Sequence, residues 1–130
     1  MGSFYKIDGY AFEQDRIKKS LETFIGNEEL GRFWLLSLEN ESIGYLALTF
    51  GFSFEYGGRD AFIDELYLEK VHRNKGYGKA VLEKLNKEAS ALGVRAIHLE
   101  VEPNNKGAKR LYGKAGFSSN KRVLMSKRLG

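Results

Sequence analysis

Hydrophobic residues recur along this chain with two different periods. A period of about 3.6 residues indicates a helix, and a period of two residues indicates a strand. Leu21, Phe24 and Ile25 recur among charged residues at a spacing close to a helical period. This spacing predicts a helix over residues 13–25. Only residues 3–7 are available for a strand before that helix, so an N-terminal edge strand is expected to be short or missing.

Two segments with the composition of β-strands follow the first predicted helix. Residues 32–38 and 42–50 are rich in aromatic and aliphatic residues and are separated by three polar residues. This arrangement predicts a hairpin, with the second strand extending as far as Tyr56. A pair of glycines then turns the chain into a third strand over residues 61–68.

The second half of the chain alternates helices and strands. Apolar residues spaced for one helical face follow Gly76, and Gly93 is expected to end that helix. Residues 96–101 read as a strand, residues 105–115 as a helix and residues 122–127 as a final strand. The predicted order of elements is therefore α-β-β-β-α-β-α-β.

Composition limits the classes of function. The 130 residues, 42% hydrophobic and 29% charged with one Pro, suit one globular domain spanning 1–130. The absence of Cys excludes disulfides, thiolate metal sites and a cysteine nucleophile, and two His residues do not predict a metal site. No apolar run approaches about 20 residues, so we expect a cytoplasmic protein without membrane contact.

The charge balance favours an anionic small-molecule ligand over nucleic acid. The net charge is +4, but 17 acidic residues are interleaved with 21 basic ones and no block of like charge reaches five. Attraction of an anionic cofactor explains this balance.

A stretch of glycines and cations, residues 73–81, joins the third strand to the second helix. Gly76 and Gly78 allow successive N–H groups to converge on one anion, and the following helix adds its free N-terminal N–H groups. A P-loop is excluded because Ala80 stands where Ser or Thr is needed, and a dinucleotide fingerprint is excluded because Val81 replaces its third glycine. The pattern predicts a site for a diphosphate.

The remaining pattern, R-x-x-G-x-G between a strand and a helix, resembles the acyl-CoA-binding signature of the GNAT superfamily of N-acetyltransferases. A second motif of that family, V-x-x-x-N-x-x-A-x-x-x-Y-x-x-x-G-F, lies about 25 residues further on, the length of a βαβ crossover. The resemblance covers residues 30 to 128. Its fixed positions are filled by Val101, Asn105, Ala108, Tyr112, Gly116 and Phe117.

The resemblance implies an α/β (α+β mixed) fold, the GNAT acyl-CoA N-acyltransferase fold, in which a mixed twisted sheet carries helices on both faces. It also implies acetyl-CoA as the acyl donor and a primary amine as the acceptor, joined by direct attack in a ternary complex without a metal. The residues that it assigns to the cofactor are Leu66, Tyr67, Leu68, Arg73, Asn74, Lys75, Gly76, Tyr77, Gly78, Lys79 and Asn105.

Acetyl transfer to an amine needs a proton donor for the leaving thiolate and a proton acceptor for the amine. The resemblance places Tyr112 as the donor, and Asp64, Glu65 and Glu100 are the candidate acceptors. In a regular strand only one of the first two can face the cleft, but a β-bulge known in the family would change that parity. Each carboxylate can instead bind a cationic substrate or lie on the surface. His98 shares strand parity with Glu100 and is interpreted as a packing residue.

Two other functions remain open at this level. A catalytically inactive acyl-CoA sensor would keep the diphosphate site without turnover, and a basic nucleic-acid-binding domain would use the same cations. The acceptor can be a small molecule or a protein amine. Alternating aromatic residues from Phe50 to Tyr56 border either the acceptor side or a subunit contact in a homodimer, and core packing explains the alternation equally well.

Overall fold

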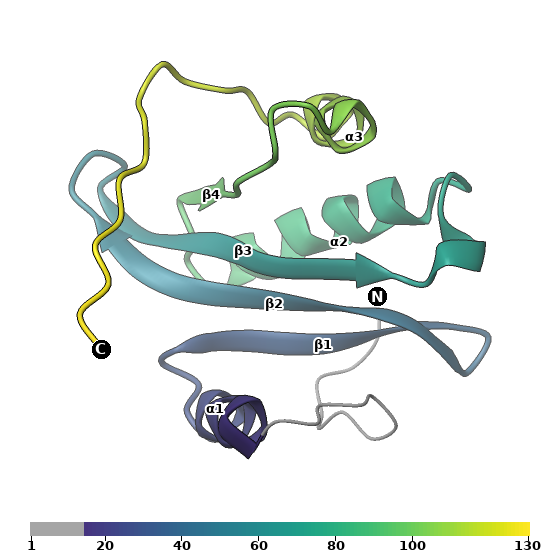
Figure 1. Cartoon of the computed structure of the whole chain (residues 1–130), viewed down its shortest axis with the longest axis horizontal. Coiled ribbons are helices and arrows are strands. Elements are labelled where there is room, and N and C mark those ends of the chain that lie inside the picture. Colours follow the sequence, from purple (N-terminus) through teal and green to yellow (C-terminus); the bar gives the residue numbers. More distant parts are fainter. Residues whose placement is uncertain (1–14) are drawn as a thin grey trace.

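The computed structural model describes residues 15–130 of the chain, with their side chains from residue 19 onward. A four-stranded sheet in the order β1-β2-β3-β4 forms its centre (Figure 1). The elements are α1 (Asp15–Ile25), β1 (Gly31–Leu38), β2 (Glu41–Ser53), β3 (Gly58–Leu68), the 3-10 helix η1 (Lys70–His72), α2 (Tyr77–Ala91), β4 (Ala96–His98) and α3 (Lys106–Lys114).

The sheet is mixed, as predicted. β1, β2 and β3 pair antiparallel, whereas β4 pairs parallel to β3 after the α2 crossover. Glu39 and Asn40 both have positive φ, 52° and 69°, between the paired residues Leu38 and Glu41. A two-residue loop of this kind matches the natural twist of a hairpin. The predicted first hairpin is therefore confirmed.

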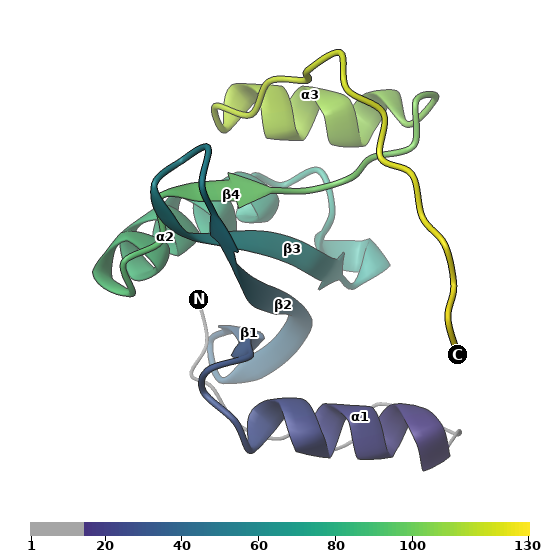
Figure 2. The ribbon, with the colours of Figure 1, turned by 90° about the vertical axis from the view of Figure 1, so that its left-hand side faces the viewer.

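The core lies between the sheet and α2, which covers one face of the sheet (Figure 2). α2 contributes the apolar positions predicted from its spacing, and Leu82 and Leu85 are almost completely buried. α1 lies beside β1, and α3 lies beside β4 and contacts α2. The buried core residues are Trp34, Leu36, Ile43, Leu46, Leu48, Ala61, Ile63, Val81, Leu82 and Leu85.

Several boundaries differ from the predictions. β2 stops at Ser53, short of Tyr56, because Gly57 takes φ 76° and its N–H bonds the Ser53 carbonyl at 2.9 Å. β3 begins at Gly58, three residues before its predicted start. The strand expected at 96–101 is reduced to Ala96–His98, because pairing with β3 ends at His98.

The predicted C-terminal strand over residues 122–127 is wrong. This segment is extended but pairs with no strand among residues 15–130. The guanidinium of Arg122 binds the carboxylate of Glu55 at 2.8 and 3.3 Å and holds the segment near the β2–β3 turn. A segment with the composition of a strand does not join a sheet unless it lies alongside the edge of a strand with which it can form hydrogen bonds. Val123 and Met125 are therefore 82% and 88% exposed.

The helix predictions are confirmed within the described residues, where the boundaries of α3 lie one residue inside the predicted range of 105–115. Gly93 and Gly116 have φ of 81° and 98° just beyond α2 and α3, as helix-ending glycines do. The N-terminal edge strand expected near residues 3–7 lies outside the described residues. Within residues 15–130 no helix is long and apolar enough to cross a membrane.

Candidate active site

β3 and β4 diverge after only three residue pairs. Asp60, Ala61 and Phe62 pair with Ala96, Ile97 and His98, and the ladder then ends. β3 continues to Leu68 while the chain after β4 turns toward α3 (Figure 1). The end of β3, the start of α2 and α3 meet here, because a Cβ added to Gly78 would lie 3.8 Å from Leu68 Cδ1 and 3.1 Å from Leu111 Cδ2. The divergence leaves backbone groups of the two segments free to bind an extended ligand.

A tight turn precedes α2 at this place. Asn74 and Gly76 have φ of 61° and 85°, and Gly76 caps the helix without a side-chain hydrogen bond. The Ala80 N–H bonds the Gly76 carbonyl at 3.2 Å, whereas within residues 15–130 no hydrogen bond engages the N–H groups of Tyr77, Gly78 and Lys79. Free N–H groups at the positive end of a 15-residue helix can bind an anion. The turn fits the diphosphate of a nucleotide cofactor.

The two glycines of the motif serve different purposes. Gly76 adopts a left-handed conformation that other residues rarely take, and a Cβ there would meet no atom within 4 Å. A Cβ on Gly78 would lie 3.1 Å from Leu111 Cδ2. Gly78 therefore allows α2 and α3 to pack closely, a role that the sequence reading did not assign.

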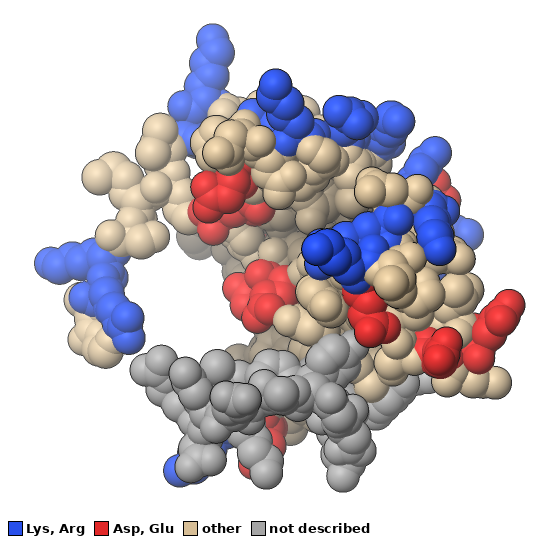
Figure 3. Space-filling model, turned by 45° about the vertical axis from the view of Figure 1, so that its right-hand side comes forward, with Lys and Arg blue, Asp and Glu red and all other residues tan. Residues whose placement is uncertain are grey.

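The cations of the motif surround the turn. Arg73 Nε donates to the Leu68 carbonyl at 2.9 Å, and its guanidinium lies 5.7 Å from the centre of the Tyr67 ring. Lys75 and Lys79 are exposed. Figure 3 shows Lys and Arg side chains gathered over this end of the molecule, with acidic side chains in the hollow beside them. Arg73 thus links the turn to the end of β3.

α3 positions two predicted residues. Asn105 caps the helix, because its Oδ1 accepts a hydrogen bond from the Ala108 N–H at 3.1 Å. Tyr112 is partly buried, and its ring meets Phe117 edge to face at 5.9 Å. Burial raises the pKa of Tyr112 above its usual 10.0. The phenol therefore keeps its proton at neutral pH.

A β-bulge in β3 determines the direction of two candidate carboxylates. Ala47 pairs with Glu65 and Leu48 with Ile63, which leaves Asp64 as the extra residue. Both carboxylates are exposed, and they lie between Ile63, which is buried in the core, and Leu66, which packs against it. The Glu65 carboxylate accepts a hydrogen bond from the Tyr45 hydroxyl at 2.8 Å.

A row of rings crosses the sheet on the face opposite α2. Phe33 stacks on Tyr45 at 5.5 Å, and Tyr45 stacks on Tyr67 at 5.6 Å. The guanidinium of Arg73 extends the row toward the turn before α2. The row therefore connects β1 to the turn before α2 through side chains.

Glu100, the third candidate carboxylate, is exposed beyond β4.

A hydrogen-bonded pair of side chains that joins β3 to β4 was not predicted from the sequence. His98 Nε2 lies 3.0 Å from Asp60 Oδ2, and the rings of Tyr56 and Phe62 lie 5.5 and 5.2 Å from the imidazole. The alternation of Asp60 with Phe62 and of Ala96 with His98 is visible in the sequence, but only the register between the strands shows that they meet. The interpretation of His98 as a packing residue is thus incomplete.

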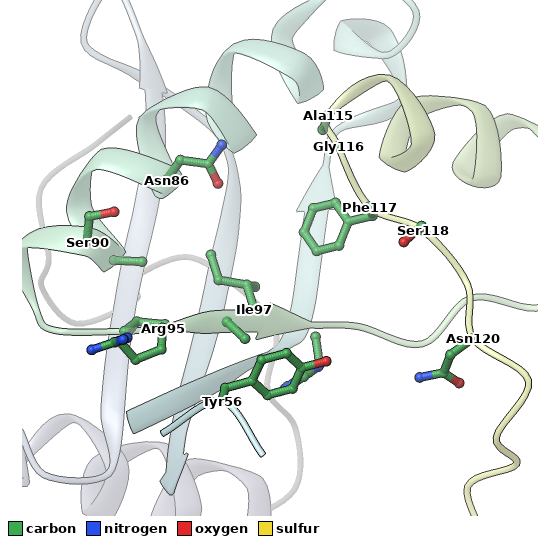
Figure 4. Close-up of a pocket in the computed structure, with 14 residues that line it drawn as sticks. Tyr56, Asn86, Ser90, Arg95, Ile97, Ala115, Gly116, Phe117, Ser118 and Asn120 are labelled. Atoms are coloured by element: carbon green, nitrogen blue, oxygen red, sulfur yellow. The ribbon is translucent and has the colours of Figure 1, made fainter. Parts of the chain in front are cut away.

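A pocket of about 460 Å³ lies along the outer side of β4 (Figure 4). Asn86 and Ser90 of the second half of α2, Phe117 after α3 and Tyr56 of the β2–β3 turn border it. None of the residues assigned to the cofactor lines this pocket, so it is separate from the turn before α2.

Of the alternating aromatic residues in β2 and its turn, only the first belongs to the core. Phe50 packs against the core, with the guanidiniums of Arg32 and Arg59 at 5.3 and 4.4 Å from its ring. Phe52 and Phe54 are 71% and 95% exposed. Burial within this chain therefore does not account for the alternation beyond Phe50.

The chain is similar to known proteins over most of its length. It is 35% identical over 97 residues to an uncharacterized N-acetyltransferase, YycN, of Bacillus subtilis (strain 168); the match covers 74% of this chain and 60% of that protein. It is also 35% identical to an integron cassette protein from the mobile metagenome of Cole Harbour Salt Marsh. That structure superposes with a TM-score of 0.80 over 94% of this chain and 75% of the other.

A more distant structure shares the fold. The aminoglycoside N-acetyltransferase AAC(6')-Iy, in complex with the bisubstrate analog CoA-S-monomethyl-acetylneamine, superposes with a TM-score of 0.75 at 14% identity. The superposition covers 93% of this chain and 84% of that one. The family model described as acetyltransferase (GNAT) family matches residues 3–117. This chain belongs to the GNAT acetyltransferase family.

Proposed function

We propose that this protein transfers the acetyl group of acetyl-CoA to a primary amine by direct attack within a ternary complex. The observation that carries the proposal is the turn before α2, where unengaged N–H groups follow Gly76 beside the divergence of β3 and β4. Family membership and the similarity to a protein named as an N-acetyltransferase support the same chemistry.

The residues fit the cofactor in two places. The N–H groups of Tyr77, Gly78 and Lys79 hold the diphosphate, with Arg73, Asn74, Lys75 and Lys79 around it. The backbone of Leu66, Tyr67 and Leu68 and the side chain of Asn105 hold the pantetheine arm between the diverging segments. When bound, the thioester supplies the electrophilic carbonyl carbon.

Proton transfer completes the reaction. The amine nitrogen forms a bond to the carbonyl carbon as the bond from carbon to sulfur breaks, and Tyr112 gives its proton to the sulfur. Because burial raises the pKa of Tyr112, the phenol is protonated when the thiolate leaves. Asp64, Glu65 or Glu100 attracts the cationic acceptor or takes a proton from it.

Cofactor binding is tested by thermal unfolding with acetyl-CoA or free CoA. A ligand at 100 times its Kd should stabilise the fold by about 2.7 kcal/mol. Gly76→Ala should weaken binding about tenfold, because the added Cβ strains the left-handed turn that presents the N–H groups. Gly57→Ala is the matched control, since φ is 76° there, a Cβ would meet no atom within 4 Å and the residue lies in the β2–β3 turn. Equal loss of affinity in both variants would contradict the assignment.

Turnover is tested by thiol release from acetyl-CoA over a panel of polyamines, aminoglycosides, small metabolite amines and peptide amines. Tyr112→Phe should lower kcat about 100-fold and leave the Kd of acetyl-CoA unchanged. An unchanged kcat would remove the proton-donor role. Binding of acetyl-CoA without thiol release from any amine would favour the sensor function instead.

A further inference from the structure

We infer that His98, held by Asp60, accepts the proton that the acceptor amine must lose, an inference that rests on the proposed function. The two side chains form a direct pair, with His98 Nε2 3.0 Å from Asp60 Oδ2. An ionised carboxylate can only accept a hydrogen bond, so Nε2 carries the hydrogen and the lone pair of the imidazole lies on Nδ1. The His98 side chain keeps 28% of its surface exposed, which leaves it open to water or substrate.

The position of the pair matches this task. Phe62 and His98 form the last residue pair before β3 and the chain after β4 separate. Ala61 is buried in the core and Ile97 packs against it, so the side chains of Phe62 and His98 lie on the face opposite α2. The amine can therefore approach from the face opposite α2, where the two segments begin to separate.

Two rings hold the imidazole in place. The ring of Phe62 lies 5.2 Å from that of His98, and the ring of Tyr56 lies 5.5 Å away. Both aromatic side chains are also partly exposed, at 38% and 42%. Their faces can contact a cationic amine beside the imidazole. The group that accepts the proton and the groups that attract the cation are thus neighbours.

The other titratable and charged groups around His98 come from three elements. Asp60 belongs to β3, Glu55 and Tyr56 belong to the β2–β3 turn, and Arg95 precedes β4 and borders the same pocket. Glu55 is bound by Arg122, so its charge is already paired. Asp60 is therefore the carboxylate in direct contact with His98.

The two protons that the amine nitrogen must lose give His98 and Tyr112 one role each. The acceptor enters as an ammonium with three protons, and the amide product retains one. His98 takes the first proton through a water molecule and releases it to solvent. Tyr112 donates its own proton to the sulfur and is reprotonated with the second proton from nitrogen. One proton per turnover is released in total.

The pH dependence of kcat distinguishes His98 from a carboxylate. An imidazole changes charge between about pH 5 and 8, whereas a carboxylate does so near pH 4. With a saturating amine that wild type acetylates, kcat should rise with pH and then level, because a base must lose its proton before it can accept one. His98→Gln should lower kcat about 100-fold and lose this rise, and Asp60→Asn should lower kcat about tenfold. Added imidazole should restore part of the rate of His98→Ala.

Two further measurements separate chemistry from folding. Thermal unfolding and the Kd of acetyl-CoA should be the same in wild type and His98→Gln. NMR of the imidazole nitrogens should show Nε2–H for His98, assigned with His72→Gln because the chain has two His residues, and Asp60→Asn should reduce that preference.

Wild-type turnover with an unchanged kcat and pH profile in His98→Gln would overturn this inference and leave the proposed function intact. A lowered kcat that keeps the rise with pH and gains nothing from imidazole would also overturn it, since it would show a structural role. A wild type that acetylates no amine would overturn the proposed function and the inference with it.

Discussion

Gly44→Ala should separate β2 from β3 at the end that borders the cofactor turn. A Cβ on Gly44 would lie 1.9 Å from the Tyr67 carbonyl oxygen and 3.0 Å from Leu68 Cα. Carbon and oxygen approach to about 3.3 Å in such strand contacts, so the strands must move apart by roughly 1.4 Å. The neighbouring atoms are backbone and cannot rotate away. The ladder pairs Gly44 with Leu68 and Tyr45 with Tyr67 would be lost.

The expected cost combines crowding with unpaired backbone groups. Overpacking in a buried site costs about 1–3 kcal/mol, and each buried group left without its hydrogen bond costs a similar amount. Gly44 is buried, so we expect the free energy of unfolding to fall by about 4 kcal/mol. The Leu68 carbonyl would also move relative to Arg73, which binds it at 2.9 Å. Affinity for acetyl-CoA should therefore fall together with stability.

Urea unfolding measures this effect through Trp34, which is the one tryptophan of the chain and is 6% exposed. With a slope of about 1.5 kcal/mol per molar urea, the midpoint should fall by roughly 2.5 M. Gly113→Ala is the matched control, because this residue lies in α3 and a Cβ there would meet no atom within 4 Å. That change should be neutral or stabilise by up to about 1 kcal/mol. A Gly44→Ala midpoint equal to that of the control would refute the reasoning.

Three further changes test other parts of the structure. Asn105→Ala removes the side-chain cap that Ala108 binds at 3.1 Å and should cost about 1 kcal/mol in urea unfolding. Leu85→Ala leaves a cavity under α2, where Leu85 is 0% exposed, and should cost about 3 kcal/mol in the same assay. Arg122→Gln removes the hydrogen bond and charge that hold the pKa of Glu55 below its usual 4.5, so that pKa should rise in an NMR titration. Because the pKa is lowered in the folded state, any stability from the pair is present above about pH 4.5 and is lost as pH falls through the lowered pKa, so a difference in urea midpoint that grows as pH falls would contradict this sign.

Local patterns in the sequence were sufficient for most of the fold. The helical spacing of Val81, Leu82 and Leu85 and the turn at Glu39 and Asn40 depend on interactions between near neighbours, so they could be read directly. The final strand could not, because a strand needs a partner edge, and Arg122 binds Glu55 instead of aligning the segment with β4. The length and composition of the segment do not indicate whether it pairs with β4.

The turn before α2 was predicted from the sequence because its glycines and cations are contiguous. The Asp60–His98 pair was not, since it joins residues 38 positions apart through a parallel register that only the folded sheet defines. The separate purpose of Gly78 was also hidden, because it depends on the position of Leu111 in another helix. The roles of individual site residues thus depend on contacts between elements more than on the motifs themselves.

The extra residue in β3 makes the choice of exposed side chains independent of the choice of buried ones. In a regular strand the two are coupled, because side chains alternate between the two faces of the sheet. A shift of the chain by one position, for example to bury an apolar residue in place of Glu65, would therefore move every buried side chain to the exposed face. With Asp64 inserted, Ile63 is buried in the core and Leu66 packs against it, while the two acidic positions between them are exposed. Substitutions at these two positions can therefore change the charge of this exposed surface without requiring compensating changes in the interior.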